Sequence, residues 1–317
     1  MGKSNIAIKQ FFRDKERFAD LFNGYVFQGE QIVKPEDLEE KDSESSIIIQ
    51  SKNSTSKGVQ KYRDITMHWK KGAALTILAI ENQDKVHYAM PVRTMLYDGL
   101  SYADQIRLLW KNQRSEKNYT EEEFLSRLCK TDKIFPVISL VFYYGLEPWD
   151  ASTDLYGMFQ QSELFHNSPL LKQYIPNYSL NLIDAGNVES LERFRSDLHF
   201  IFGMLQCKDD SNALRTYVTE HKDYFGNVDL ETYQAIGALL HSEKKVAAVI
   251  PQTEHGGVNM CKAIDDLYNS GVQEGIEKGL FALIEAYKEL DLPKEEIVSR
   301  LMEKFSYTKE EVLKYLN

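Results

Sequence analysis

The stretch from Tyr62 to Gln83, YRDITMHWKKGAALTILAIENQ, decides the fold of this chain. In residues 64–69 apolar and polar side chains alternate, which is the pattern of a strand with one buried face. Residues 74–80 are apolar at nearly every position, as expected of a central strand that is covered on both faces. A Lys-Lys-Gly segment at 70–72 separates the two runs. The stretch therefore predicts a β-hairpin that turns at 70–72.

Two carboxylates meet at the open end of this hairpin. Asp64 opens the first strand and Glu81 follows the second, and a hairpin centred near Lys71 places Asp64 opposite residues 78–80. Mg²⁺ is commonly held by one or two carboxylates together with water and substrate phosphate, so this pair can hold a hard divalent cation. The alternative is that both carboxylates are solvated or form salt bridges.

A second apolar run, IFPVISLVFYY at 134–144, predicts another central strand. Residues 92–112 lie between it and the hairpin, and they are expected to form a helix that packs one face on a sheet. The apolar residues of that face are Val92, Leu96, Leu100, Ala103 and Ile106. A strand, a helical crossover and a further strand imply a parallel pair with a right-handed connection. With a first helix at 5–26 and a first strand at 47–49, the order is αβββαβ around a mixed sheet.

Arg93 and Asp20 are charged residues outside the hairpin, and each has two possible roles. Arg93 and Tyr97 are neighbours in the first turns of the predicted helix. There Arg93 either grips a phosphate or pairs with an acid such as Asp98 or Glu81. Asp20 in the first helix is interpreted as a surface aspartate beside a packed Phe-Leu stripe, and the alternative is an acid that approaches a metal.

The order of motifs along the chain resembles a known family. The motifs are Arg63-Asp64 with Lys70, IENQ at 80–83, MPVR at 90–93 followed by Tyr97, PVISLVFYYG at 136–145 with Trp149, and EGIEKG at 274–279. They are similar to the recombination-promoting nuclease (Rpn) or putative-transposase family of the PD-(D/E)XK nuclease superfamily. The resemblance covers most of the chain. It implies an α/β fold with a PD-(D/E)XK restriction-endonuclease-like core, in which helices flank a mixed central sheet, and a mostly helical C-terminal part.

This resemblance also implies an activity, namely a Mg²⁺- or Mn²⁺-dependent DNA endonuclease that promotes recombination or acts in a mobile-element or genome-defence setting. The implied catalytic residues are Asp64, Glu81 and Gln83, and the implied metal ligands are Asp64, Glu81 and the backbone carbonyl of Asn82. Gln83 stands where many relatives carry lysine. The expected DNA-binding residues are Lys61, Arg63, Lys70, Arg93 and Tyr97. The alternative function is a catalytically weak or inactive nuclease-fold protein that acts as a DNA- or protein-binding regulatory module.

Charge and composition limit where in the cell this protein is expected and what it is expected to bind. The chain has 317 residues and a net charge of −10, which argues against a protein that coats nucleic acid generally. Residues 51–71 nevertheless carry six Lys and Arg against the single acid Asp64, and this is either where DNA approaches or a solvated basic face. No apolar run approaches 18 residues and no signal peptide opens the chain. A cytoplasmic protein of bacterial type with no membrane partner is expected.

Three regions are predicted along the chain. Residues 1–152 form the nuclease core, 153–257 form a helical extension of that core with one extended segment at 178–184, and 258–317 form a helical C-terminal tail. The tail is acidic and remote in sequence from the Asp-Glu pair. We expect it to mediate interaction, as a homo-oligomer contact.

Overall fold

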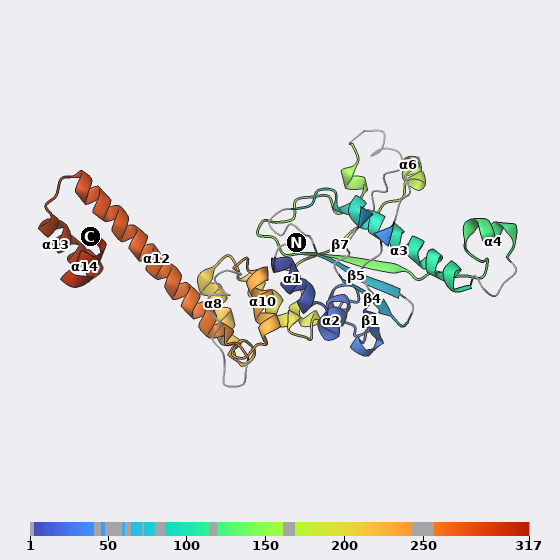
Figure 1. The fold of residues 1–317 in the computed structure, drawn as a ribbon, viewed down its shortest axis with the longest axis horizontal. Coiled ribbons are helices and arrows are strands. Elements are labelled where there is room, and N and C mark those ends of the chain that lie inside the picture. The colour runs from blue at the N-terminus through green and yellow to red at the C-terminus, as the bar shows by residue number, and fades with distance from the viewer. Residues whose placement is uncertain are drawn as a thin grey trace.

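The computed structural model describes residues 3–40, 46–47, 59–60, 65–71, 73–79, 86–113, 119–160, 169–242 and 257–316. The fold is mixed α/β with a helical C-terminal part (Figure 1). Within these ranges the strands are β1 (Leu38–Glu40), β2 (Ser46–Ile47), β3 (Val59–Gln60), β4 (Ile65–Trp69), β5 (Ala73–Ala79), β6 (Val137–Tyr143) and β7 (Asn181–Asp184). The helices from the N-terminus to the middle of the chain are α1 (Lys3–Phe11), α2 (Lys15–Tyr25), α3 (Met90–Gln113), α4 (Glu121–Ser126) and α6 (Pro169–Tyr174). The remaining helices are α7 (Leu198–Gln206), α8 (Ser211–Glu220), α9 (Lys222–Phe225), α10 (Leu230–Leu239), α12 (Met260–Glu289), α13 (Lys294–Phe305) and α14 (Lys309–Leu316).

The main sheet has five strands in the order β1-β4-β5-β6-β7. β4 pairs antiparallel with β1 and with β5, and the β4–β5 register runs from Ile65 opposite Ile77 to Trp69 opposite Ala73. β6 lies parallel to β5 and to β7. The predicted hairpin, its parallel partner and the extended segment near 178–184 are therefore all confirmed as parts of one mixed sheet.

The first strand of this sheet is not the predicted one. The predicted first strand is the run of three isoleucines at 47–49, of which 48 and 49 lie outside the described residues. Within the described ranges β2 pairs with β3, in a separate two-stranded sheet. The first strand is β1, in which Leu38 is buried while Glu39 and Glu40 are exposed. It is an edge strand, held by hydrogen bonds to β4 and by one buried side chain, so it has little hydrophobic pattern to reveal it.

The predicted helix at 5–26 is two helices. α1 ends at Phe11, and α2 begins after Asp14, whose carboxylate accepts hydrogen bonds from the backbone N–H groups of Glu16 and Arg17. An aspartate that caps a helix start satisfies N–H groups that have no partner inside the helix. The chain therefore bends at this cap, and the Phe-rich faces of both helices still reach one core.

The sheet is covered on both faces. Ile138, Leu140 and Phe142 of β6 pack with the N-terminal helices and with α7 and α10 in the main core, which draws buried residues from Ile8 to Ile264. Val141 and Tyr143 point to the opposite face, where they pack with Met90 and Tyr97 of α3. Alternate side chains of a strand face opposite sides, so this split defines two layers of helix around one sheet. The main core therefore also draws on the chain beyond residue 152.

Asp20 is not the surface residue that the sequence suggested. Its side chain is 4% exposed, and its carboxylate accepts hydrogen bonds from the backbone N–H groups of Arg195 and Ser196 and from the Ser196 hydroxyl, at 2.6–3.0 Å. These donors lie just ahead of α7. Asp20 therefore fastens α2 to the start of α7, a contact that no local pattern indicates because its partners are 175 residues away.

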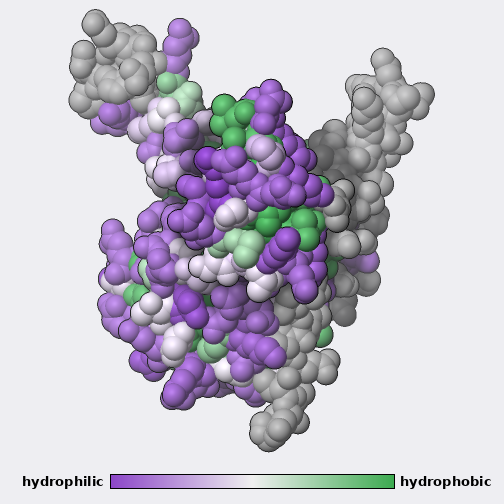
Figure 2. Space-filling model, turned by 90° about the vertical axis from the view of Figure 1, so that its left-hand side faces the viewer, coloured by the Kyte–Doolittle hydropathy of each residue, from purple (hydrophilic) through white to green (hydrophobic). Residues whose placement is uncertain are grey.

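The C-terminal part has a second core. α12 has 30 residues and is therefore about 45 Å long. Its first turns, including Met260 and Ile264, belong to the main core, whereas its last turns pack with α13 and α14 in a separate cluster around Leu280, Ile284 and Leu301. Figure 1 shows α12 running out from α8 and α10 to this distant helical unit. Figure 2, which looks from that side, shows a mostly hydrophilic surface with small apolar areas. Self-association through this part stays a prediction.

Capping boxes begin α4 and α14. Thr120 and Glu123 bond each other's backbone N–H groups, and Thr308 and Glu311 do the same. None of the helices within the described ranges combines the length and the apolar character that crossing a membrane requires.

The Asp20 contacts give a stability prediction. Asp20→Ala leaves two buried backbone N–H groups without their acceptor, so it should lower the free energy of unfolding by about 3 kcal/mol, measured by urea denaturation. Asp20→Asn keeps one acceptor oxygen and should cost less. Asp14→Ala, which removes only a helix cap, serves as the control and should cost about 1 kcal/mol. Equal effects of Asp20→Ala and Asp14→Ala would contradict a special role for Asp20.

Candidate functional site

Three parallel strands end at one edge of the sheet. The last paired residue of β5, Ala79, lies opposite Phe142 of β6, and Tyr143 lies opposite Asp184 of β7. β4 runs the other way and begins near this edge, with Ile65 opposite Ile77. In open α/β sheets ligands bind outside the carboxyl ends of the strands, and this edge is therefore the candidate functional site.

Most of the predicted site residues lie outside the described residues, and their placement is not described. These are Asp64, Glu81, Asn82, Gln83, Lys61 and Arg63. In sequence, Asp64 directly precedes β4, and Glu81 follows the end of β5 by two positions. The strand ends that adjoin these two carboxylates, Ile65 and Ala79, thus lie at the same edge. Within the described ranges no group of three or more His, Cys, Asp and Glu side chains is arranged to hold a metal.

The crossover helix α3 connects this edge to the start of β6. Three contacts follow in order along its length: Asp98 with Ser139, Tyr102 with the backbone N–H of Val137, and Gln105 with the backbone of Phe135. Residue numbers rise along α3 as they fall along β6, so the helix runs antiparallel to the strand. Its N-terminus therefore lies at the carboxyl edge.

Arg93 and Tyr97 occupy the first turns of α3 at that edge. The Arg93 Nε donates to the Tyr97 hydroxyl at 3.2 Å, and the guanidinium carbon lies 5.4 Å from the ring centroid of Tyr97. Tyr97 is 7% exposed and Arg93 is half-buried. The Asp98 carboxylate, one of the acids considered as a partner of Arg93, accepts hydrogen bonds from the hydroxyls of Ser139 and Tyr178. The Arg93 guanidinium thus contacts both the hydroxyl and the ring of Tyr97.

Lys70 lies at the opposite end of the hairpin. It is in the turn that joins β4 to β5, and its Nζ is 3.3 Å from a carboxylate oxygen of Glu39. The neighbouring Lys71 is 3.6 Å from Asp37. A strand of seven residues is about 23 Å long, so the structure does not bring Lys70 together with Arg93 and Tyr97.

The buried face of α3 is not the predicted apolar face. Val92, Leu96 and Ala103 are exposed, whereas the buried positions include polar residues. Those polar residues are Thr94, Asp98, Ser101 and Asp104. The prediction of a helix from the apolar spacing is confirmed, but the prediction that these apolar residues form its buried face is wrong. The face that meets the sheet is selected by hydrogen bonds to β6 and to the segment before β7.

Asp98 is the centre of this polar contact. Its side chain is 6% exposed, and its carboxylate accepts a hydrogen bond of 2.5 Å from the Ser139 hydroxyl and another from the Tyr178 hydroxyl. These residues were not predicted as a group from the sequence. Thr94, Asp98 and Ser101 do recur at helical spacing, and a polar stripe opposite an apolar one was the available signal.

The edge itself is negatively charged around Tyr143. The Tyr143 hydroxyl donates to the backbone carbonyl of Glu147, and its ring lies edge-on to Trp149 with centroids 5.2 Å apart. Burial raises the pKa of the Tyr143 phenol, and the charges of Asp184, Glu147 and Asp150 raise it further. Tyr143 is therefore a neutral donor at physiological pH. Lys208 contributes a positive charge nearby, and its Nζ donates to the carbonyl of Gly145 at 2.8 Å.

The polar contact predicts an effect on stability that is coupled to Ser139. Asp98→Ala removes the acceptor of a buried hydroxyl and should lower the unfolding free energy by about 2–3 kcal/mol. In the Asp98→Ala/Ser139→Ala double variant the hydroxyl is absent as well. The double variant should therefore lose less than the sum of the two single variants, as measured by thermal and urea unfolding of all four proteins. Additive losses would mean that the two side chains contribute independently.

Comparison with known proteins agrees with the motifs. The family model described as "Putative transposase, YhgA-like" matches residues 6–222, more than half of the chain. This span contains all five strands of the main sheet and the crossover helix α3. No curated protein and no solved structure matches the chain significantly. The resemblance to the Rpn or putative-transposase family is confirmed, and the chain belongs to the family of YhgA-like putative transposases.

Proposed function

We propose that this protein is a metal-dependent DNA endonuclease built on a PD-(D/E)XK core. The observation that carries the proposal is the geometry of the hairpin. Asp64 and Glu81 adjoin strand ends that share one edge, beside a parallel strand and the N-terminus of the crossover helix. Family membership supports a transposase- or nuclease-like role in general. The metal dependence, the DNA substrate and a role in recombination or genome defence belong to the proposal.

The residues that would hold Mg²⁺ or Mn²⁺ are Asp64, Glu81 and the backbone carbonyl of Asn82. Two carboxylates and a carbonyl oxygen are hard ligands that suit these cations and leave positions for water and a phosphate oxygen. A bound divalent cation lowers the pKa of a water ligand and stabilises the charge that develops on the scissile phosphate. Two observations support these residues as ligands of the cation. Their oxygen donors are of the type that Mg²⁺ and Mn²⁺ prefer, and the strand ends next to Asp64 and Glu81 lie at the same edge of the sheet.

Gln83 would orient the attacking water. Its amide can donate one hydrogen bond and accept another, so it can direct a water without changing the charge of the site. A lysine at this position would supply a positive charge that favours a hydroxide-like nucleophile. With glutamine, the water is positioned, and its activation does not come from this side chain.

Arg93 would hold a phosphate next to the site. It lies in the first turns of α3, where the helix dipole also favours an anion. The hydrogen bond from Arg93 to Tyr97 and their stacking restrict the guanidinium before DNA arrives. Because the chain carries a net charge of −10, binding to DNA depends on such local groups and should weaken with salt.

The test of the proposal is plasmid cleavage by the purified protein with Mg²⁺ or Mn²⁺, with and without EDTA. Nicked or cut plasmid that appears only with the metal supports the endonuclease. Failure to cleave with any ion, together with failure to bind a metal, would favour the alternative, a nuclease-fold protein that acts as a DNA- or protein-binding module.

Removal of either carboxylate should abolish cleavage. Asp64→Ala and Glu81→Ala should leave the fold intact or slightly more stable, because crowded carboxylates repel each other without a cation. Both should bind Mn²⁺ much more weakly in calorimetry. Glu36→Ala removes an exposed acid elsewhere and should change neither property. Unchanged Mn²⁺ binding in either variant would exclude that residue as a ligand.

Substitution of Gln83 should have a smaller effect. Gln83→Ala should slow cleavage by about ten- to a hundredfold, since the water loses its orientation while the carboxylates remain. Gln83→Lys should keep or raise activity and reduce any preference for Mn²⁺ over Mg²⁺. Single-turnover rates on one plasmid measure both. An inactive Gln83→Lys protein that still binds metal would mean that the site requires the amide.

A further inference from the structure

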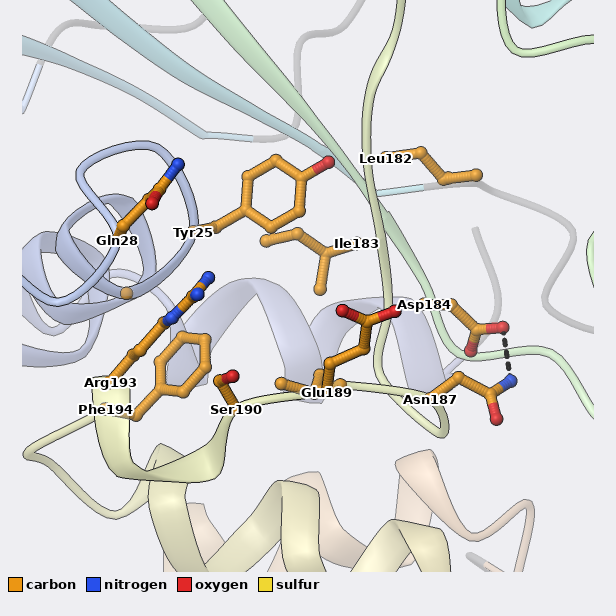
Figure 3. A pocket seen from close by; sticks show the side chains of 12 residues that line it. Tyr25, Gln28, Leu182, Ile183, Asp184, Asn187, Glu189, Ser190, Arg193 and Phe194 are labelled. Carbon is orange, nitrogen blue, oxygen red and sulfur yellow. Dashed lines mark hydrogen bonds between the residues drawn. The ribbon is translucent and has the colours of Figure 1, made fainter.

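A cavity of about 290 Å³ lies beside β7, at the same edge of the sheet as the candidate site. It is bounded by the end of α2, the outer side of β7 and the loop that leads to α7. Figure 3 shows Gln28, Tyr25 and Arg193 on one side of it, with Glu189 between them and Asp184. Ligand pockets are usually about 300–1,000 Å³, so this volume suits a single planar ring system.

The walls of the cavity are fixed by the backbone. Gln28 and Gly29 both have positive φ, 52° and 95°, a conformation that folds the chain back after α2. A Cβ on Gly24 would lie 2.3 Å from the ring of Phe194. Only glycine at this position therefore allows α2 to pack so closely against the Phe194 side chain. On the other wall the Asp184 carboxylate accepts hydrogen bonds from the backbone N–H of Gly186 at 3.1 Å and from the Asn187 amide at 2.8 Å.

The polar groups that line the cavity include Arg193, Glu189 and Tyr25. The Arg193 guanidinium and the Glu189 carboxylate both line the cavity, and within the described part of the chain neither has an ion-pair or hydrogen-bonding partner for its side chain. Tyr25 also lines the cavity, and its hydroxyl has a proton to donate. Burial raises the pKa of this phenol, which keeps the proton in place.

These charges exclude simple ions as the ligand. A phosphate that binds Arg193 would also meet the carboxylates of Glu189 and Asp184. A cation that binds Glu189 would meet the guanidinium. The complementary ligand is therefore uncharged, with hydrogen-bond acceptors on one edge, donors on another and a flat face for the Tyr25 ring. Nucleobases have this combination.

Guanine fits this arrangement better than the other bases. Its N7 and O6 are adjacent acceptors that an arginine can bind with two hydrogen bonds. Its N1–H and N2–H₂ groups are adjacent donors that a carboxylate can accept together. No other DNA base offers a pair of adjacent acceptors and a pair of adjacent donors. We propose that the cavity binds an unpaired guanine base, with Arg193, Glu189 and Tyr25 as the recognising groups.

The source of the guanine follows from the position of the cavity and rests on the proposed endonuclease function. β7 is two strands from β5, so the end of β7 is about 10 Å along the sheet edge from the end of β5, and the cavity lies just beyond β7. A few nucleotides of single strand span this distance. The base must be unpaired, because the edge that Glu189 binds is occupied by cytosine in a duplex. The cavity would therefore read a single-stranded or locally opened guanine next to the cleaved bond.

The test is binding without cleavage. Fluorescence anisotropy in EDTA, at one fixed low salt concentration, compares labelled hexathymidylate with the same strand carrying one central guanine, adenine or cytosine. The guanine strand should bind the full-length protein about tenfold more tightly or better. Arg193→Gln and Glu189→Gln should each remove most of this preference. Arg195→Gln and Glu192→Gln make the same charge changes at exposed positions of the same segment and should keep it.

The outcomes separate this proposal from the endonuclease proposal. Because no metal is present, the measurement holds whether or not the protein cleaves plasmid. Equal binding of all four strands, or equal effects of the cavity and control variants, would overturn the assignment to a guanine base within DNA. Calorimetry with dGMP and dAMP tests the source. If the protein binds dGMP but shows no preference among the strands, the ligand is not a base within DNA. That result would assign the cavity to a free guanine nucleotide.

Discussion

The parallel pairing of β5 with β6 is the constraint on which the rest of the structure depends. Parallel neighbours cannot be joined by a tight turn, so the chain must return along the whole length of the strand before β6 begins. α3 makes that return, and its contacts at Ser139, Val137 and Phe135 hold it antiparallel to β6. The carboxyl ends of β5, β6 and β7, the start of β4 and the first turns of α3 are thereby gathered at one edge.

The contact between α3 and the sheet has an apolar part, where Met90 and Tyr97 pack with Val141 and Tyr143, and a buried polar part. Thr66, Thr76 and Ser139 occupy one row across three strands, and Ser139 donates to Asp98 above it. Hydrogen bonds have a preferred length and direction, so they define the position of the helix along the strand more sharply than apolar packing does. In return, each partner becomes costly to remove. Such precision at the crossover helix matters because Arg93 and Tyr97 extend from its first turns.

Electrostatics sets a further condition on any function at this edge. The whole chain is acidic, and Asp184, Glu147 and Asp150 keep the surroundings of Tyr143 negative. An anionic substrate can approach only where local positive charge offsets this field. Arg93 and Lys208 carry positive charge at the edge. Lys70 and Lys71 carry it at the far end of the hairpin, where they pair with Glu39 and Asp37. Under the proposed function a divalent cation would add to the positive charge where the two carboxylates adjoin the strand ends.

Local patterns in the sequence were sufficient for the hairpin at 64–80 and the strand at 134–144. Each depends on residues a few positions apart, namely the period of a strand or an unbroken apolar run. The family could also be recognised, because its motifs keep their order along the chain.

The tertiary structure alone decided the first strand, the buried face of α3 and the burial of Asp20. β1 is held by its neighbour β4 and has almost no hydrophobic pattern of its own. The face of α3 is chosen by Ser139 and Tyr178, which lie 41 and 80 residues from Asp98, and Asp20 is buried by donors 175 residues away. The pairing of polar groups so distant in sequence leaves no periodicity at either end, so it can be read only once the chain has folded.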